Sequence, residues 1–140
     1  MLDRDAILNR LDRLAQYGRI LRQLQPVPYD EFVSQVEHYG LAERYLHLSA
    51  ECIFDIGQMV ISGMGFRRPG EYREIIQVLV EEKVLSPELG RRLDSLAGFR
   101  NILVHAYMDI DEQKVYQNLQ GNLADFDDYA QEIVAFLRAN

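Results

Sequence analysis

The segment GFRNILVHAYMDID, residues 98–111, lies at the end of a long helical pattern. The pattern starts at Ser86-Pro87-Glu88, where serine can cap free backbone N–H groups and proline fits the first helical turn. Leucines then recur at helical spacing up to and into the segment: Leu89, Leu93, Leu96 and Leu103. The sequence therefore predicts one helix that starts at residues 86–88 and runs into this segment.

Helical patterns also account for the rest of the chain. Apolar residues recur every three or four positions in four further stretches, which cover residues 3–24, 30–62, 71–82 and 112–138. Pro26 and Pro28 end the first stretch, Gly40 is a candidate break early in the second, and residues 63–70 have the composition of a loop. Asp111 can cap the last helix. No stretch alternates with period two for long, so we predict an all-α fold, an up-and-down bundle of four main helices plus a short helix.

The composition is that of a globular protein with one core. The 140 residues are 48% hydrophobic and 26% charged, which suits a single domain over residues 1–140. No apolar run approaches the roughly 20 residues that span a bilayer, and the N-terminal residues lack the apolar core of a signal peptide. The single cysteine, Cys52, has no internal partner for a disulfide. These features predict a cytoplasmic protein that has no membrane partner.

The net charge of −7 argues against a general nucleic-acid binder, because such proteins neutralise phosphates. Basic residues are nevertheless concentrated in residues 1–25 and 65–105. Four arginines of the second group have two open interpretations, RNA phosphate contacts or surface solubility: Arg67, Arg68, Arg91 and Arg92. The charge pattern is therefore compatible with a local positive site on an acidic protein.

The segment 98–111 contains the residues best suited to chemistry. Arg100, His105 and Tyr107 lie within eight residues of one another. Histidine can exchange a proton near neutral pH, and arginine matches two phosphate oxygens. Such a pair can in principle cleave RNA without a metal: the 2′-hydroxyl attacks, histidine moves protons, and arginine stabilises the charged phosphorus. The alternative is an ordinary helix end, where a cationic histidine is favoured near the C-terminus.

The spacing of Arg100 and His105 restricts how they could act together. Residues five apart on a regular helix point about 140° away from each other. Asn101 and His105, four apart, share a face, whereas Arg100 and His105 do not. Either the helix ends before His105, or two copies of the segment meet across a two-fold axis. The second alternative predicts a homodimer.

RNILVHAY, residues 100–107, resembles the R-N-x-L-V-H-x-Y form of the R-x4-6-H motif of HEPN domains. The chain looks most like the HepT-like toxins of HEPN–MNT toxin–antitoxin modules. The resemblance extends to RYLHLSAECIFDIG at residues 44–57, to residues 72–101, and to MDIDEQKVYQNL at residues 108–119. It covers about residues 1–138.

This resemblance implies a dimeric HEPN-like bundle that acts as a metal-independent endoribonuclease toxin of a type VII-like module, with no cofactor. Arg100 and His105 would be catalytic and would cut RNA in a cleft between protomers. The implied partner is a small MNT-type nucleotidyltransferase antitoxin, which binds the toxin and adds AMP to Tyr107. The alternatives are a non-catalytic HEPN subunit that presents a substrate to a nucleotidyltransferase, and a bundle with a purely structural role.

Three further residues are candidates for supporting roles. Asn101 lies inside the motif, and Glu51 and Asp55 match acidic positions of the resembling segment 44–57. The two acids either orient the catalytic pair or belong to a solvated helix face with ion pairs four residues apart. Glu43 and His47 lie on the same helix stripe, which leaves a metal site as another alternative and a solvated face as the simpler one.

Overall fold

The computed structural model describes residues 1–105 and 111–140, with the backbone alone for residues 101–105. Every regular element in those residues is an α-helix, so the all-α fold class is confirmed. None of these helices is both long enough and apolar enough to cross a membrane. In chain order the helices are α1 (Arg4–Leu24), α2 (Tyr29–Ser34), α3 (Val36–Met64), α4 (Tyr72–Glu81), α5 (Pro87–Leu93), α6 (Leu96–His105), α7 (Glu112–Gly121) and α8 (Leu123–Ala139).

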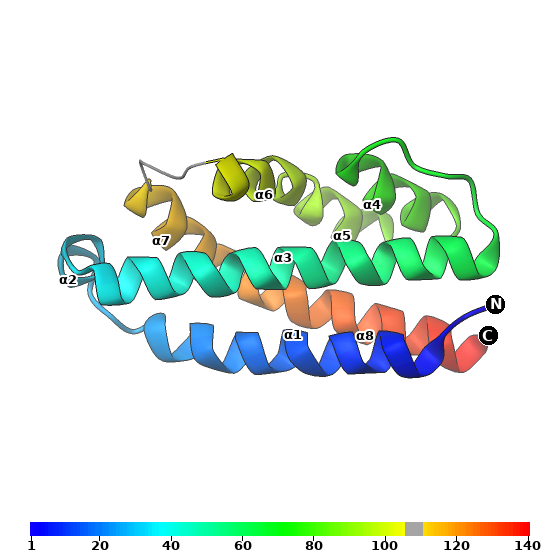
Figure 1. The fold of residues 1–140 in the computed structure, drawn as a ribbon, viewed down its shortest axis with the longest axis horizontal. Coiled ribbons are helices and arrows are strands. Elements are labelled where there is room, and N and C mark those ends of the chain that lie inside the picture. Colours follow the sequence, from blue (N-terminus) through cyan, green and yellow to red (C-terminus); the bar gives the residue numbers. More distant parts are fainter. Residues whose placement is uncertain (106–110) are drawn as a thin grey trace.

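The two longest helices form the centre of the bundle. α1 and α3 run antiparallel and side by side, and α8 packs along α1 (Figure 1). α4, α6 and α7 pack on α3 as well. A continuous apolar core joins these helices, and its fully buried members include Ile7, Leu21, Ile53, Leu79 and Ile133. α3 therefore contacts most of the other helices, and any polar face on it is bordered by several of them.

The second predicted helical region consists of two helices that meet at Gln35, so the predicted break at Gly40 is wrong. Gln35 is extended, with φ −120° and ψ 116°, and its carbonyl oxygen accepts from the N–H of His38. Phe32 of the short helix α2 is completely buried, and the chain turns after it to run along α1. Gly40 lies inside α3, where packing of a long amphipathic helix outweighs the low helix propensity of one glycine.

Two more of the predicted helices are each divided in two. The helix predicted from residues 86–88 ends at Leu93, and α6 starts separately at Leu96. The helix predicted over 112–138 divides at Asn122, between α7 and α8. Asp94 and Asn122 flank these breaks, and short polar side chains favour helix ends because they compete for backbone hydrogen bonds. The bundle therefore has more and shorter helices than four main helices plus one.

Both predicted helix caps are confirmed. The Ser86 hydroxyl accepts from the N–H of Leu89 at 3.2 Å, and the Asp111 carboxylate accepts from the N–H of Lys114 at 3.2 Å. Glu132 of α8 adds to the first cap, because its Oε1 accepts from the Ser86 N–H at 2.6 Å. The capping roles of Ser86 and Asp111 were therefore predicted correctly, whereas the breaks within the predicted helices were not.

Gly57 allows α4 to lie directly on α3. A Cβ atom added at Gly57 would lie 2.6 Å from Cγ2 of Ile75 and 3.1 Å from Cδ1 of Leu79, closer than side chains pack. The loop to α4 begins at Gly65, whose φ of 71° is a conformation that glycine adopts without strain. This arrangement brings Tyr72, the first residue of α4, against α3.

Candidate active site

Arg100 is held by residues of two other helices. It lies in the middle of α6, and its side chain is 17% exposed. Its Nε donates to Oε1 of Glu51 on α3 at 2.6 Å, and its Nη2 donates to the hydroxyl of Tyr72 on α4 at 3.0 Å. The guanidinium carbon lies 4.1 Å from the centre of the Tyr72 ring, a cation–π contact. These contacts fix the direction of the positive group.

Glu51 is the carboxylate at the centre of this cluster. Its side chain is 30% exposed, so its hydrogen bond to Arg100 is partly shielded from water. Nε2 of His47, one turn earlier on α3, lies 3.4 Å from the same Oε1. A side-chain contact four residues apart, as the sequence suggested for this stripe, is therefore present between His47 and Glu51. Glu51 also contacts Arg100, as expected if the acids of this stripe orient the catalytic pair.

Asp55 follows Glu51 by one turn of α3. Partial burial of its carboxyl group raises the pKa of Asp55, and the nearby Glu51 carboxylate raises it further, while Arg10 and Arg100 lower it. Asp55 is therefore within electrostatic range of Arg100 and of α1. Among the described residues, no three His, Cys, Asp or Glu side chains are grouped closely enough to hold a metal ion.

α6 continues through His105. The spacing allowed two alternatives, and the first was a helix that ends before His105. The backbone rules out this first alternative, because it is helical through His105. Positions 100 and 105 of one regular helix are rotated by about 140° from each other. The pairing of two protomers, the second alternative, stays a prediction. The side chains of Asn101 and His105, and the whole of Tyr107, lie outside the described residues.

Tyr72 is the residue that sequence reasoning missed. Its position in the predicted helix 71–82 suggested a core role, and its ring does pack edge-on against Phe54, with ring centres 5.0 Å apart. Its hydroxyl nevertheless accepts from Arg100, which lies 28 positions later in the chain. Nothing in the spacing links the two residues, because only the packing of α4 and α6 on α3 brings them together.

Arg67 and Arg92, two of the four arginines whose roles the sequence left open, form hydrogen bonds to carboxylates. Arg67 donates from Nε and Nη2 to the two oxygens of Glu81, at 3.0 and 2.8 Å. Arg92 donates from Nη1 to Asp125 at 2.5 Å and to Asp128 at 2.9 Å. These contacts favour a structural role for Arg67 and Arg92 over RNA binding.

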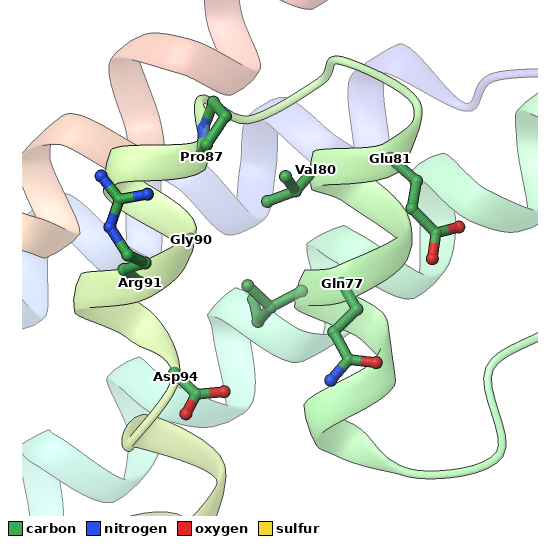
Figure 2. A pocket seen from close by; sticks show the side chains of 8 residues that line it. Gln77, Val80, Glu81, Pro87, Gly90, Arg91 and Asp94 are labelled. Carbon is green, nitrogen blue, oxygen red and sulfur yellow. The ribbon is translucent and has the colours of Figure 1, made fainter.

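One cavity between α4 and α5 does not have Arg100 in its lining. It has a volume of about 470 Å³ and lies between α4 and α5, with lining side chains from both helices and from Asp94 (Figure 2). Neither Glu51 nor Tyr72 lines it. Another cavity, of about 390 Å³, lies between α1 and α3 and includes Glu51 and Asp55 in its wall. This second cavity borders the Arg100 cluster.

Comparison with known proteins identifies the family. The family model described as Ribonuclease HepT-like matches residues 7–133. The chain belongs to this family. YutE of Bacillus subtilis is 34% identical over 95 residues, which make up 68% of this chain and 66% of YutE. The solved structure of YutE, a cytosolic protein, superimposes with a TM-score of 0.86 over 99% of this chain and 92% of YutE.

Two further proteins are similar to this HepT-like chain. The tRNA nuclease HepT of Aphanizomenon flos-aquae is 28% identical over 131 residues, 94% of this chain and 89% of that protein. The tri-AMPylated HEPN toxin of Shewanella oneidensis, solved in complex with its MNT antitoxin, superimposes with a TM-score of 0.84. That superposition covers 96% of this chain and 99% of the toxin at 21% identity, which shows a shared HEPN fold.

Proposed function

We propose that this chain is a metal-independent endoribonuclease toxin that acts in the cytoplasm as a homodimer, with residues 1–140 as a single HEPN domain. Arg100 and His105 are its catalytic residues, and an MNT-type nucleotidyltransferase neutralises it by AMPylation of Tyr107. The observation that carries the proposal is the position of Arg100. In a chain of the HepT-like family, the arginine of the R-x4-6-H motif is directed by Glu51 and Tyr72.

The reaction needs only a proton acceptor and a positive charge. His105 of one protomer takes the proton of the RNA 2′-hydroxyl, and the 2′ oxygen forms a bond to phosphorus. Arg100 of the other protomer stabilises the charge on the phosphoryl oxygens. The bond from phosphorus to the 5′ oxygen breaks, and that oxygen takes up a proton from water. The hydroxide left behind takes the proton from His105, which returns to its starting form. The products are a 2′,3′-cyclic phosphate and a 5′-hydroxyl end.

The supporting residues follow from the contacts of Arg100. Glu51 and Tyr72 hold its guanidinium, so little conformational freedom is lost when a phosphate binds. Asp55 affects the same cluster by its charge. We assign Asn101 a supporting role because it shares a helix face with His105.

Cleavage of RNA in the presence of a chelator tests this function. The purified protein is incubated with total cellular RNA and excess EDTA, beside the His105→Ala and Arg100→Lys variants. We expect new fragments with cyclic phosphate ends from the wild type alone, because lysine keeps the charge of Arg100 but not its planar fork. Intact RNA with the wild-type protein would favour the non-catalytic alternative, a subunit that serves a nucleotidyltransferase.

A further inference from the structure

We propose that the cavity between α1 and α3 is a nucleotide subsite, which binds one phosphate and one base of the substrate RNA beside Arg100. This inference rests on the proposed ribonuclease function and adds to it a contact that directs the RNA strand. The cavity has a volume of about 390 Å³, which is within the range of pockets that hold small ligands.

One stripe of α1 forms a wall of this cavity. Ala6, Arg10, Arg13 and Tyr17 are spaced by three or four residues, so they share a helix face. Asn9 lies beside them. The facing wall comes from α3 and consists of Leu48, Glu51, Cys52 and Asp55. The cavity thus combines two guanidinium groups, an aromatic ring and an amide, which are the groups that bind the phosphate and the base of a nucleotide.

Arg10 and Arg13 are available for a phosphate. Across residues 1–105 and 111–140, neither side chain lies within 4.0 Å of a carboxylate oxygen, in contrast to Arg92, which binds two carboxylates. Arg10 donates from Nη1 to the Ala6 carbonyl oxygen at 3.4 Å, a long hydrogen bond that a phosphate can replace.

Each of the two carboxylates of the facing wall has an arginine near it. Glu51 is already matched by Arg100 at 2.6 Å. Arg10 and Arg100 lie within electrostatic range of Asp55 and offset part of its negative charge. Arg10 and Arg13 line the cavity and Arg100 borders it, so three positive groups face the two carboxylates. The net positive charge favours binding of a phosphate.

Tyr17 supplies the surface for a base. It is partly buried, and its ring centre lies 5.5 Å from that of Tyr45, which supports it from α3. An aromatic side chain at the wall of a basic cavity is a typical stacking platform for an unpaired base. Because Glu51 both lines the cavity and binds Arg100, a nucleotide in the cavity would be separated from the catalytic arginine by a single side chain.

The test measures RNA binding without cleavage. A dye-labelled single-stranded RNA is titrated with His105→Ala protein that carries either Arg10→Gln and Arg13→Gln or the control substitution Arg19→Gln. Arg19 is exposed on the same helix, but it points about 180° from Arg10 and about 120° from Arg13. We expect the cavity variant to bind about tenfold more weakly per arginine lost, and its logarithmic salt dependence to fall by about 0.7 per arginine. The control should bind like its parent.

Cleavage separates this inference from the proposed function, and it is measured with Arg10→Gln and Arg13→Gln introduced into protein that retains His105. If the wild type cleaves RNA and the cavity variant binds and cleaves equally well, the subsite is wrong and the ribonuclease function stands. If no RNA is cleaved but the cavity variant still loses RNA affinity, the ribonuclease function is wrong and the subsite stands. Tyr17→Phe should retain binding and Tyr17→Leu should lose it, with helical circular dichroism unchanged in both. Equal binding by Tyr17→Leu would overturn the stacking role.

Discussion

The guanidinium carbon of Arg100 lies 4.1 Å from the centre of the Tyr72 ring, while its Nη2 donates to the hydroxyl of the same residue at 3.0 Å. The guanidinium of Arg100 thus contacts both the ring and the hydroxyl of one tyrosine. The Glu51 carboxylate accepts from Nε of the same guanidinium at 2.6 Å. Two helices that are remote in sequence from α6 therefore determine where the charge of Arg100 is directed.

Tyr72 should act as a positioning residue for Arg100. Tyr72→Phe keeps the ring contact and loses the hydrogen bond, so we expect a fall in kcat of about threefold to tenfold. Tyr72→Leu loses both contacts, and its kcat should fall about a hundredfold because a small displacement of a catalytic group is costly. The two variants are compared by single-turnover RNA cleavage, with KM measured alongside. A purely structural role would lower thermal stability and leave kcat of the folded fraction unchanged, which would contradict this assignment.

Asp55 should lower the stability of the protein at neutral pH. Its folded-state pKa is raised, so the folded protein binds the Asp55 proton more tightly than the unfolded chain does. The free energy of unfolding therefore falls as the pH rises from the ordinary aspartate pKa of about 3.9 through the raised pKa of Asp55 in the folded protein. Asp55→Asn should raise the melting temperature at neutral pH and have little effect below the ordinary value. A lower melting temperature at pH 7 would mean that attraction to Arg10 and Arg100 outweighs burial.

AMPylation of Tyr107 should block cleavage by occupying the phosphate position. The modification adds a bulky nucleotide and a negative phosphodiester two residues after His105, where it can pair with Arg100. The chain is incubated with its partner nucleotidyltransferase and ATP, and its intact mass is measured. We expect the gain of one or more AMP units and loss of RNA cleavage with unchanged circular dichroism. Labelling that persists in Tyr107→Phe would place the modification elsewhere.

The sequence was sufficient for the fold class and for two helix caps, but not for the starts of α3, α6 and α8. Helical spacing predicts α1 almost to the residue, and Ser86 and Asp111 cap helices as expected. The breaks at Gln35 and Asn122 were not predictable from spacing, because apolar residues continue at helical intervals across both of them. Packing of buried residues such as Phe32 decides where the chain turns, and that depends on contacts between distant segments.

The candidate site could be predicted in part. Arg100 and His105 stand out because two reactive side chains lie in one short motif, and Glu51 was a candidate from the resemblance of its segment. Tyr72 and the arginine pair on α1 were not assigned roles, since their relation to Arg100 exists only after α1, α3, α4 and α6 pack together. Local sequence shows which residues can do chemistry, and the packing shows which of them meet.

The central claim is that Arg100 of one protomer and His105 of the other form each active site. Mixed dimers test it most directly. Arg100→Ala and His105→Ala chains with different affinity tags are coexpressed, and the dimers that carry both tags are isolated. In such a dimer one site lacks both residues and the other retains both. We predict that each variant alone is inactive, and that the mixed dimer cleaves RNA in EDTA at about half of the wild-type rate per dimer, since one of two sites is intact. An inactive mixed dimer with an intact helical spectrum would contradict the shared site.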